Sequence, residues 1–225
     1  RGGSRAPAYN SIVAAGENAC ILHYDRNDAE VKDGDLILID AGCEYKYYAS
    51  DITRTFPANG TFNPQQKAIY ELVLKAQDAA IDAVQPGAPW DAPHNASVRV
   101  ITQGLIKLGL IEGTLAKAIK AEAYRDFYMH RVGHWIGIDV HDVGDYKIDE
   151  KWRLLEPGMV TTIEPGIYIA PDNKRVPKKW RGIGVRIEDD VLVTKNGNRV
   201  LTTGIPKTVA EIETFMAQAK QKRAA

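Results

Sequence analysis

The sequence predicts an α+β fold built from two similar half-domains, and three observations lead to this prediction. Short β-rich segments follow one another closely enough to form antiparallel strand pairs. Segments with helical periodicity and capping residues lie between them. In addition, residues 34–42 recur as residues 158–166, with glycine, isoleucine, carboxylate and glycine at matching positions. The repeat indicates that the second half of the chain has the architecture of the first.

Length, charge and cysteine content exclude several classes of protein. The 225 residues are 44% hydrophobic, enough to bury a core as one large domain or two small ones. Lys plus Arg equals Asp plus Glu at 29 each, so no net field attracts nucleic acid or an anionic membrane. No apolar run approaches the roughly 18 residues of a membrane span. Cys20 and Cys43 form neither a disulfide framework nor a C-x-x-C motif, which favours a reducing, cytoplasmic compartment.

Two carboxylates lie in the first predicted strand pair. Residues 36–39 read Leu-Ile-Leu-Ile, a run too short for a helix and too continuous for a surface strand, and they end at Asp40. After a polar turn, residues 45–56 have high strand propensity and contain Asp51. The continuous apolar run predicts a buried strand that Asp40 closes. A strand, a short turn and a second strand predict an antiparallel pair.

The segment before this pair is predicted to contain two further strands. Residues 1–8 are polar and glycine-rich without a starting Met, and we interpret them as a linker or a cut end of the chain. Residues 11–15 and 19–23 flank a Gly-Glu-Asn segment, a pattern typical of two strands around a turn. His23 then lies at the end of the second strand.

Helix signals occupy the middle and the end of the chain. The first predicted helix begins at the cap Asn63 and stops at Pro86-Gly87. The other expected caps are Asp91, for a helix ended by Gly109, then Thr114 for a short helix, and Thr208. We expect the last helix to bury Ile212, Phe215 and Met216.

Residues 129–142 hold three of the five histidines, namely His130, His134 and His141. A lone histidine is more often a satisfied core or surface residue than a functional one, but three together weaken that interpretation. The glycines and the β-branched run at 136–140 predict a loop entering a strand rather than a helix. On an extended chain His134 and His141 would point in opposite directions, so we expect different roles for them.

Each copy of the repeat pairs two acids, Asp40 with Asp51 and Glu164 with Glu188. Acids at strand ends are often ordinary turn residues, yet repetition of the whole context weighs against that alternative. If the halves pack about a pseudo-two-fold axis, the four carboxylates converge, and like charges in a poorly solvated site require cations. Oxygen ligands with the imidazole of His134 suit two divalent ions, Mn²⁺ first, with Co²⁺ or Zn²⁺ as alternatives.

Five segments resemble the signature set of the pita-bread metallopeptidases. They are residues 39–42, 50–55, 133–137, 162–166 and 185–190. The likeness runs from about Tyr9 to the C-terminal helix, and residues 20–24 and 140–144 are most similar to bacterial aminopeptidase P, with prolidase second. The resemblance implies a single catalytic domain over residues 1–225. It also implies a pita-bread fold, with a curved, mostly antiparallel sheet and helices on its outer face.

The resemblance implies a role for each matching residue. Asp40 would hold one metal ion alone, Asp51 and Glu188 would bridge both ions, and His134 with Glu164 would complete the other. Glu164 would also orient or deprotonate the attacking water. The remaining matches are substrate residues: His130 and His141 at the scissile bond, His23 in the proline pocket, and Arg186 and Tyr168 nearby.

The implied activity is removal of the N-terminal residue from Xaa-Pro peptides by a hydroxide bridging two metal ions. Two alternatives are a prolidase restricted to dipeptides and a metal-free pita-bread binding module. All five ligand positions are filled, which weighs against the metal-free binding module and against a metal-free creatinase-like hydrolase. Residues 22–24 and 182–184 favour the aminopeptidase over the prolidase.

Three features depart from the family pattern. Aminopeptidase P and prolidase usually carry an N-terminal domain before this one, and the present sequence does not contain it. Two properties therefore stay open: the length of peptide that is accepted, and whether the protein forms a homo-oligomer. Arg131-Val132 and Tyr48 are bulkier than the resemblance leads us to expect.

Overall fold

Each copy of the repeat forms one strand of a three-stranded antiparallel sheet. The computed structural model describes residues 2–224. The sheet of the first half has the order β2 (Ile12–Ala15), β3 (Leu36–Asp40) and β6 (Thr53–Pro57). The sheet of the second half has the order β13 (Gly197–Val200), β12 (Asp189–Thr194) and β9 (Val160–Ile163). The predicted division into two similar halves is therefore confirmed, and so is the antiparallel pairing.

The other strands form smaller antiparallel pairings. They are β1 (Ala6–Pro7), β4 (Cys43–Tyr45), β5 (Tyr48–Ala49), β7 (Lys147–Ile148), β8 (Lys151–Trp152), β10 (Gly166–Ile169) and β11 (Ile183–Arg186). β4 lies between β1 and β5, whereas β7 pairs with β8 and β10 with β11. Short 3₁₀ helices occur at η1 (Gly16–Cys20), η2 (Ala123–Asp126) and η3 (Lys178–Trp180).

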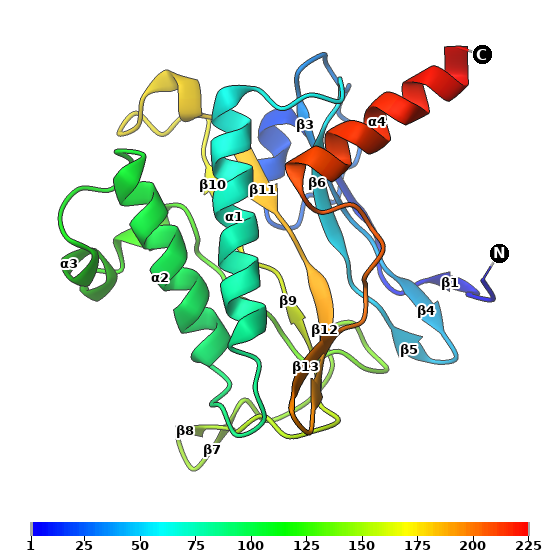
Figure 1. Ribbon diagram of the computed structural model, residues 1–225, viewed down its shortest axis with the longest axis vertical. Coiled ribbons are helices and arrows are strands. Elements are labelled where there is room, and N and C mark those ends of the chain that lie inside the picture. The colour runs from blue at the N-terminus through cyan, green and yellow to red at the C-terminus, as the bar shows by residue number, and fades with distance from the viewer. Residues whose placement is uncertain (1, 225) are drawn as a thin grey trace.

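Helices cover one side of these strands (Figure 1). The helices are α1 (Pro64–Asp82), α2 (Ala92–Lys107), α3 (Leu115–Lys120) and α4 (Val209–Ala224). α1 packs against α2 on one side and against β9, β10 and β11 on the other. The main apolar core lies between them, with Ile69, Val73 and Ile101 from the helices meeting Ile167 and Val185 from the strands. Within the described residues, no helix has both the length and the apolar character that crossing a bilayer requires.

Local capping signals located the helix starts well. Asn63 and Gln66 form a reciprocal capping box at α1, and Thr114 accepts from the Lys117 N–H at α3. Thr208 and Glu211 form the same reciprocal contacts at α4. The end of α1 was predicted less well: the helix stops at Asp82, before Pro86-Gly87, because the chain must turn to reach α2.

Residues 19–23 are not a strand, so that prediction is wrong. Gly16 adopts a left-handed backbone with φ of 57°, and the chain continues as the 3₁₀ helix η1. η1 packs against β11, where a Cβ on Gly184 would lie only 2.2 Å from the Ala19 carbonyl oxygen. This long-range contact replaces the hairpin expected from the local pattern, and His23 lies in a loop.

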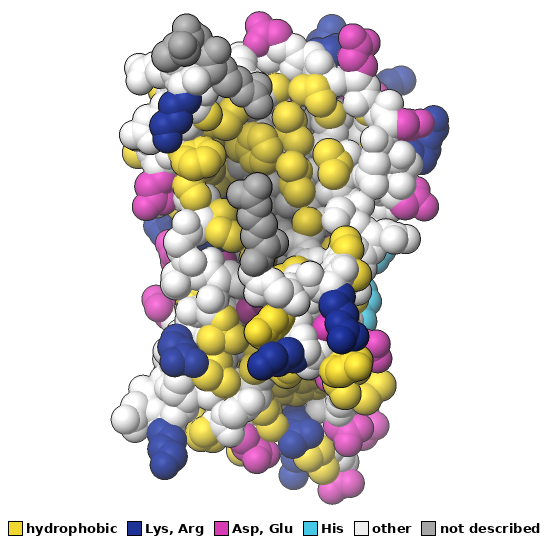
Figure 2. Space-filling view, turned by 90° about the vertical axis from the view of Figure 1, so that its right-hand side faces the viewer, with side chains coloured by type: hydrophobic (Ala, Val, Ile, Leu, Met, Phe, Trp, Pro, Cys, Tyr) yellow, Lys and Arg dark blue, Asp and Glu magenta, His cyan; other side chains and the backbone are white. Residues whose placement is uncertain are grey.

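The predicted strand at residues 45–56 is interrupted. It divides into the end of β4, then β5 and most of β6, and Asp51 lies in the gap before β6. The prediction for Phe215 is also wrong, since 59% of its surface is exposed, whereas Ile212 is buried and Met216 packs on the core. α4 projects from the body of the molecule (Figure 1), and apolar side chains remain visible on that face (Figure 2).

Candidate metal centre and substrate cavity

A cavity of about 650 Å³ draws its lining from both halves of the chain. Nine of the ten residues predicted as site residues lie in its wall. They are His23, Asp40, Asp51, His130, His134, His141, Glu164, Arg186 and Glu188. The tenth, Tyr168, is almost fully buried and lies behind this wall, in contact with His130 and Arg186.

Strand ends bring the four acids together. Asp40 is the last residue of β3, and Asp51 lies two residues before β6. Glu164 follows β9, and Glu188 directly precedes β12. The Glu188 N–H donates to the Thr53 carbonyl oxygen at 3.1 Å, which joins the two halves at this point. The sheets therefore deliver their acids to one place.

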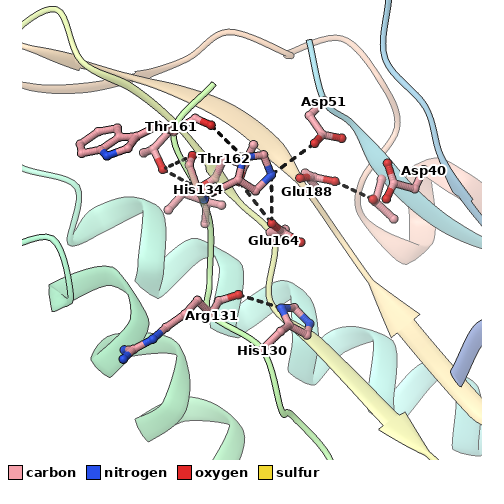
Figure 3. A network of polar contacts seen from close by, with 12 residues as sticks. Asp40, Asp51, His130, Arg131, His134, Thr161, Thr162, Glu164 and Glu188 are labelled. Carbon is pink, nitrogen blue, oxygen red and sulfur yellow. Dashed lines mark hydrogen bonds and ion pairs between the residues drawn. The ribbon is translucent and has the colours of Figure 1, made fainter. Parts of the chain in front are cut away.

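Three side chains form the tightest group, Asp51, His134 and Glu188 (Figure 3). One ligand atom from each lies within 4.8 Å of the others. His134 Nε2 also lies 3.4 Å from a carboxylate oxygen of Asp51 and from one of Glu164. His134 Nδ1 lies 2.9 Å from the Trp135 carbonyl oxygen, so Nδ1 donates and Nε2 faces the acids.

Asp40 is not a member of this group, and protein groups already bind it. Arg186 donates to Asp40 Oδ2 at 2.7 Å. The Tyr9 hydroxyl contacts Asp40 Oδ1 at 2.5 Å and also contacts Asp51. Tyr9 was not predicted, because it lies 31 positions before Asp40 and no spacing or periodicity links the two.

Burial disfavours the charged form of the two acids from the second half, Glu164 and Glu188. It raises the pKa of Glu188 well above its ordinary range. It also raises the pKa of Glu164 to about 7, against the opposing charges of His134 and Arg186. One Glu188 oxygen, Oε1, is buried without a hydrogen-bond partner. Such an oxygen is costly to bury unless a cation or proton satisfies it.

At His134 and Asp51, hydrogen bonds and nearby charges shift the pKa more than burial does. Burial opposes protonation of His134, but the hydrogen bond to Asp51 and the charge of Glu164 outweigh it and raise the His134 pKa to about 9. For Asp51, burial is likewise outweighed by hydrogen bonds from His134 and Tyr9, which lower its pKa. A buried set of carboxylates with one correctly oriented imidazole nitrogen fits divalent cations.

His134 and His141 do not point in opposite directions, so that prediction is wrong. Their ring centroids lie 4.4 Å apart. The run at 136–140 forms no strand, and the Asp142 N–H donates to the Trp135 carbonyl oxygen at 3.1 Å, which turns the chain back on itself. The His23 ring lies 6.5 Å from His141 on the other side.

A hydrogen-bond chain orients His130. Its Nδ1 donates to the Arg131 carbonyl oxygen at 2.7 Å, so its Nε2 accepts from the Tyr168 hydroxyl at 2.8 Å. Arg186 in turn donates to that hydroxyl at 3.2 Å. Burial lowers the His130 pKa to about 3, so the ring is neutral.

Several supporting residues were missed although they adjoin predicted ones. Thr53 donates to Glu188 at 2.6 Å, and Asp190 accepts from the Asp51 N–H at 3.1 Å. Thr162 accepts from the His134 N–H at 3.0 Å. Each lies within a segment that carries the family resemblance, so adjacency to an acid was the available signal.

Comparison with known proteins agrees with this geometry. Residues 1–195 match the model of metallopeptidase family M24. The chain is 56% identical to a Xaa-Pro aminopeptidase of Haemophilus influenzae over 95% of its length, and 41% identical to the human Xaa-Pro dipeptidase over 96%. It superimposes on the structure of the Pseudomonas aeruginosa aminopeptidase PepP with a TM-score of 0.97 and 69% identity, covering 98% of this chain and 50% of that one.

The chain spans about half the length of the relatives it matches, 49% of the Haemophilus protein and 50% of the human one. The family model nevertheless covers most of the present sequence, and the superposition extends over both halves of the fold. The chain belongs to metallopeptidase family M24.

Proposed function

We propose that this chain is the catalytic part of a two-metal Xaa-Pro aminopeptidase of the cytoplasm. The observation that carries the proposal is the convergence of four acids and His134 in one cavity that also contains three further histidines. Relatives at about half identity are named Xaa-Pro aminopeptidases, which supports the substrate class.

The donor set supports two ions, with Mn²⁺ favoured by its oxygen-rich character. Asp40 would hold one ion alone, and His134 with Glu164 would hold the other. Asp51 and Glu188 would bridge them. Two such ions would supply an activated water at neutral pH and polarise the scissile carbonyl.

The side chains of the protein would then transfer protons and orient the substrate. Glu164, at the edge of the acid cluster, would accept a proton at one carboxylate oxygen and later release it to the leaving nitrogen. His141, whose ring lies beside that of His134, would support negative charge on the carbonyl oxygen. Burial keeps His130 neutral, and the Tyr168 hydroxyl fixes its ring in the cavity wall.

Selectivity for proline requires a pocket rather than a hydrogen bond. A proline after the scissile bond has no N–H and a ring of fixed shape, which ordinary aminopeptidases reject. His23 and Leu22 line the cavity near His141 and present a surface for that ring. Arg186 lies in the cavity wall and is held by Asp40 and Tyr168, so this part of the pocket is rigid.

Three peptides test the proposal, with the Mn²⁺-loaded protein and a chelated control. We expect cleavage of Ala-Pro-Ala and little cleavage of Ala-Ala-Ala. Cleavage of Ala-Pro alone would select the prolidase alternative, which the human relative supports. Equal cleavage of Ala-Ala-Ala would exclude both. Elemental analysis should find about two Mn²⁺ per chain, and a value near zero would contradict the two-metal site.

A further inference from the structure

One wall of the cavity contains no predicted site residue. It carries three aromatic rings, Trp90, Tyr146 and Trp152, and two cationic side chains, Arg131 and Lys147. We call these five residues the cation–aromatic wall. The Trp90 and Tyr146 rings pack with their centroids 4.9 Å apart. The wall is therefore a packed surface that faces the same space as the acids.

Trp152 contacts both cations. The Arg131 guanidinium carbon lies 5.0 Å from the Trp152 ring centroid, and Lys147 Nζ lies 4.8 Å from it. Lys147 is the direct cross-strand partner of Trp152 in the β7–β8 hairpin. These distances are those of cation–π contacts, so both positive groups lie against the same ring.

The hairpin adopts a strained turn to achieve this placement. Asp149 and Glu150 connect the strands with φ values of 47° and 60°, a left-handed backbone that normally selects Gly or Asn. Strained turns without such residues persist where the surrounding structure holds them, and they cluster at binding sites.

The positive charge of the wall is largely uncompensated. Among residues 2–224, no carboxylate lies within 4.0 Å of the Arg131 guanidinium. Its side chain extends away from the acid cluster (Figure 3). Lys147 lies 3.9 Å from Glu150, but that carboxylate is 97% exposed and its effect is screened by water.

We propose that the cation–aromatic wall binds a carboxylate of the substrate located after the proline, either the C-terminus or an acidic side chain. This inference rests on the proposed peptidase function. The cavity offers acids on one wall and cations on another, and a short peptide carries an amino group at one end and a carboxylate at the other. Arg131 or Lys147 can donate to this carboxylate, and Trp152, which contacts both cations, excludes water from one side of it.

The test compares Ala-Pro-Ala, its C-terminal amide, and Ala-Pro-Glu amide with the Mn²⁺-loaded protein. The variant is R131Q/K147Q, and the matched control is R99Q, which removes an exposed charge from α2. We expect the double variant to raise KM for Ala-Pro-Ala or Ala-Pro-Glu amide, the two peptides with a carboxylate after the proline, by about three- to tenfold. The kcat values and the KM for Ala-Pro-Ala amide should not change. The two carboxylate peptides distinguish the C-terminus from an acidic side chain as the group bound.

A calorimetric titration with Pro-Ala and Pro-Ala amide gives a readout that does not need turnover. We expect tighter binding of the free acid, lost in R131Q/K147Q and retained in R99Q. Equal affinity for acid and amide, or an acid preference that survives in the double variant, would overturn the inference. If no Xaa-Pro peptide is cleaved, the proposed function fails, and the titration still decides whether the wall binds a carboxylate.

Discussion

Both halves of the fold supply acids to the same cavity, but two of these acids, Asp40 and Glu188, have different partners. In the first half, Asp40 is bound by Arg186 and Tyr9, so protein groups already offset its charge. In the second half, Glu188 has one oxygen bonded to Thr53 and one with no partner. Glu188 therefore depends more strongly on a bound cation than Asp40 does. The two halves bring their acids to one cavity but surround them with different partners.

The largest expected loss of metal and activity comes from changing Glu188, in the second half of the fold. E188Q keeps the shape of the side chain but removes its charge, so we expect metal content to fall and activity to drop by more than about 100-fold, since even residues behind ligands cost 10–100-fold. Elemental analysis and Ala-Pro-Ala hydrolysis measure both effects. Retained metal with full activity would contradict the assignment of Glu188.

The neighbouring histidines separate metal binding from substrate handling. H134A should lose metal, because Nε2 faces Asp51 and Glu164. H141A should keep its metal and lose about 100-fold in kcat, in the range of a residue that acts on the substrate. Metal content measured beside kcat decides between them, and equal metal loss in the two variants would refute these roles.

A smaller effect is expected in the first copy. Y9F removes the hydroxyl that contacts Asp40 and Asp51, so we expect metal affinity to fall about tenfold, as for other groups that orient ligands. Y168F serves as the control, since its hydroxyl contacts His130 and Arg186 rather than the acids. Unequal losses of the two ions would sharpen the difference between the halves.

The pH dependence of stability should be the mildest effect, and it concerns the metal-free protein. Glu164 has its pKa raised from 4.5 to about 7, and His134 from 6.5 to about 9. A raised pKa in the folded state means that stability is complete below the ordinary pKa and is lost as pH rises through the shifted one. The Tm after chelation should therefore fall between about pH 6.5 and 9. Below about pH 6.5 the lowered pKa of His130 makes stability rise with pH and opposes the decrease.

Two controls test this cause. E164Q should remove the part of the Tm decrease that lies below about pH 7, and adding Mn²⁺ should raise Tm most at the alkaline end. A Tm that rises across the interval would show that other groups control the stability.

Local sequence patterns were sufficient to predict the structure wherever a short segment determines its own conformation. Helix caps such as Asn63 depend on residues three positions away, and they were located correctly. The repeat predicted the two-sheet architecture because strand, turn and acid recur together in each copy. The acids that line the cavity could be named for the same reason.

The sequence alone thus determined the repeat, the helix starts and which acids share the cavity, because each depends on neighbouring residues or on a duplicated pattern. Tertiary structure decided how the site is completed. It folded His141 back beside His134, brought Tyr9 onto Asp40, and placed Arg131 over Trp152. These contacts join residues whose spacing follows no helical or strand period, so only the packing of the whole chain could bring them together.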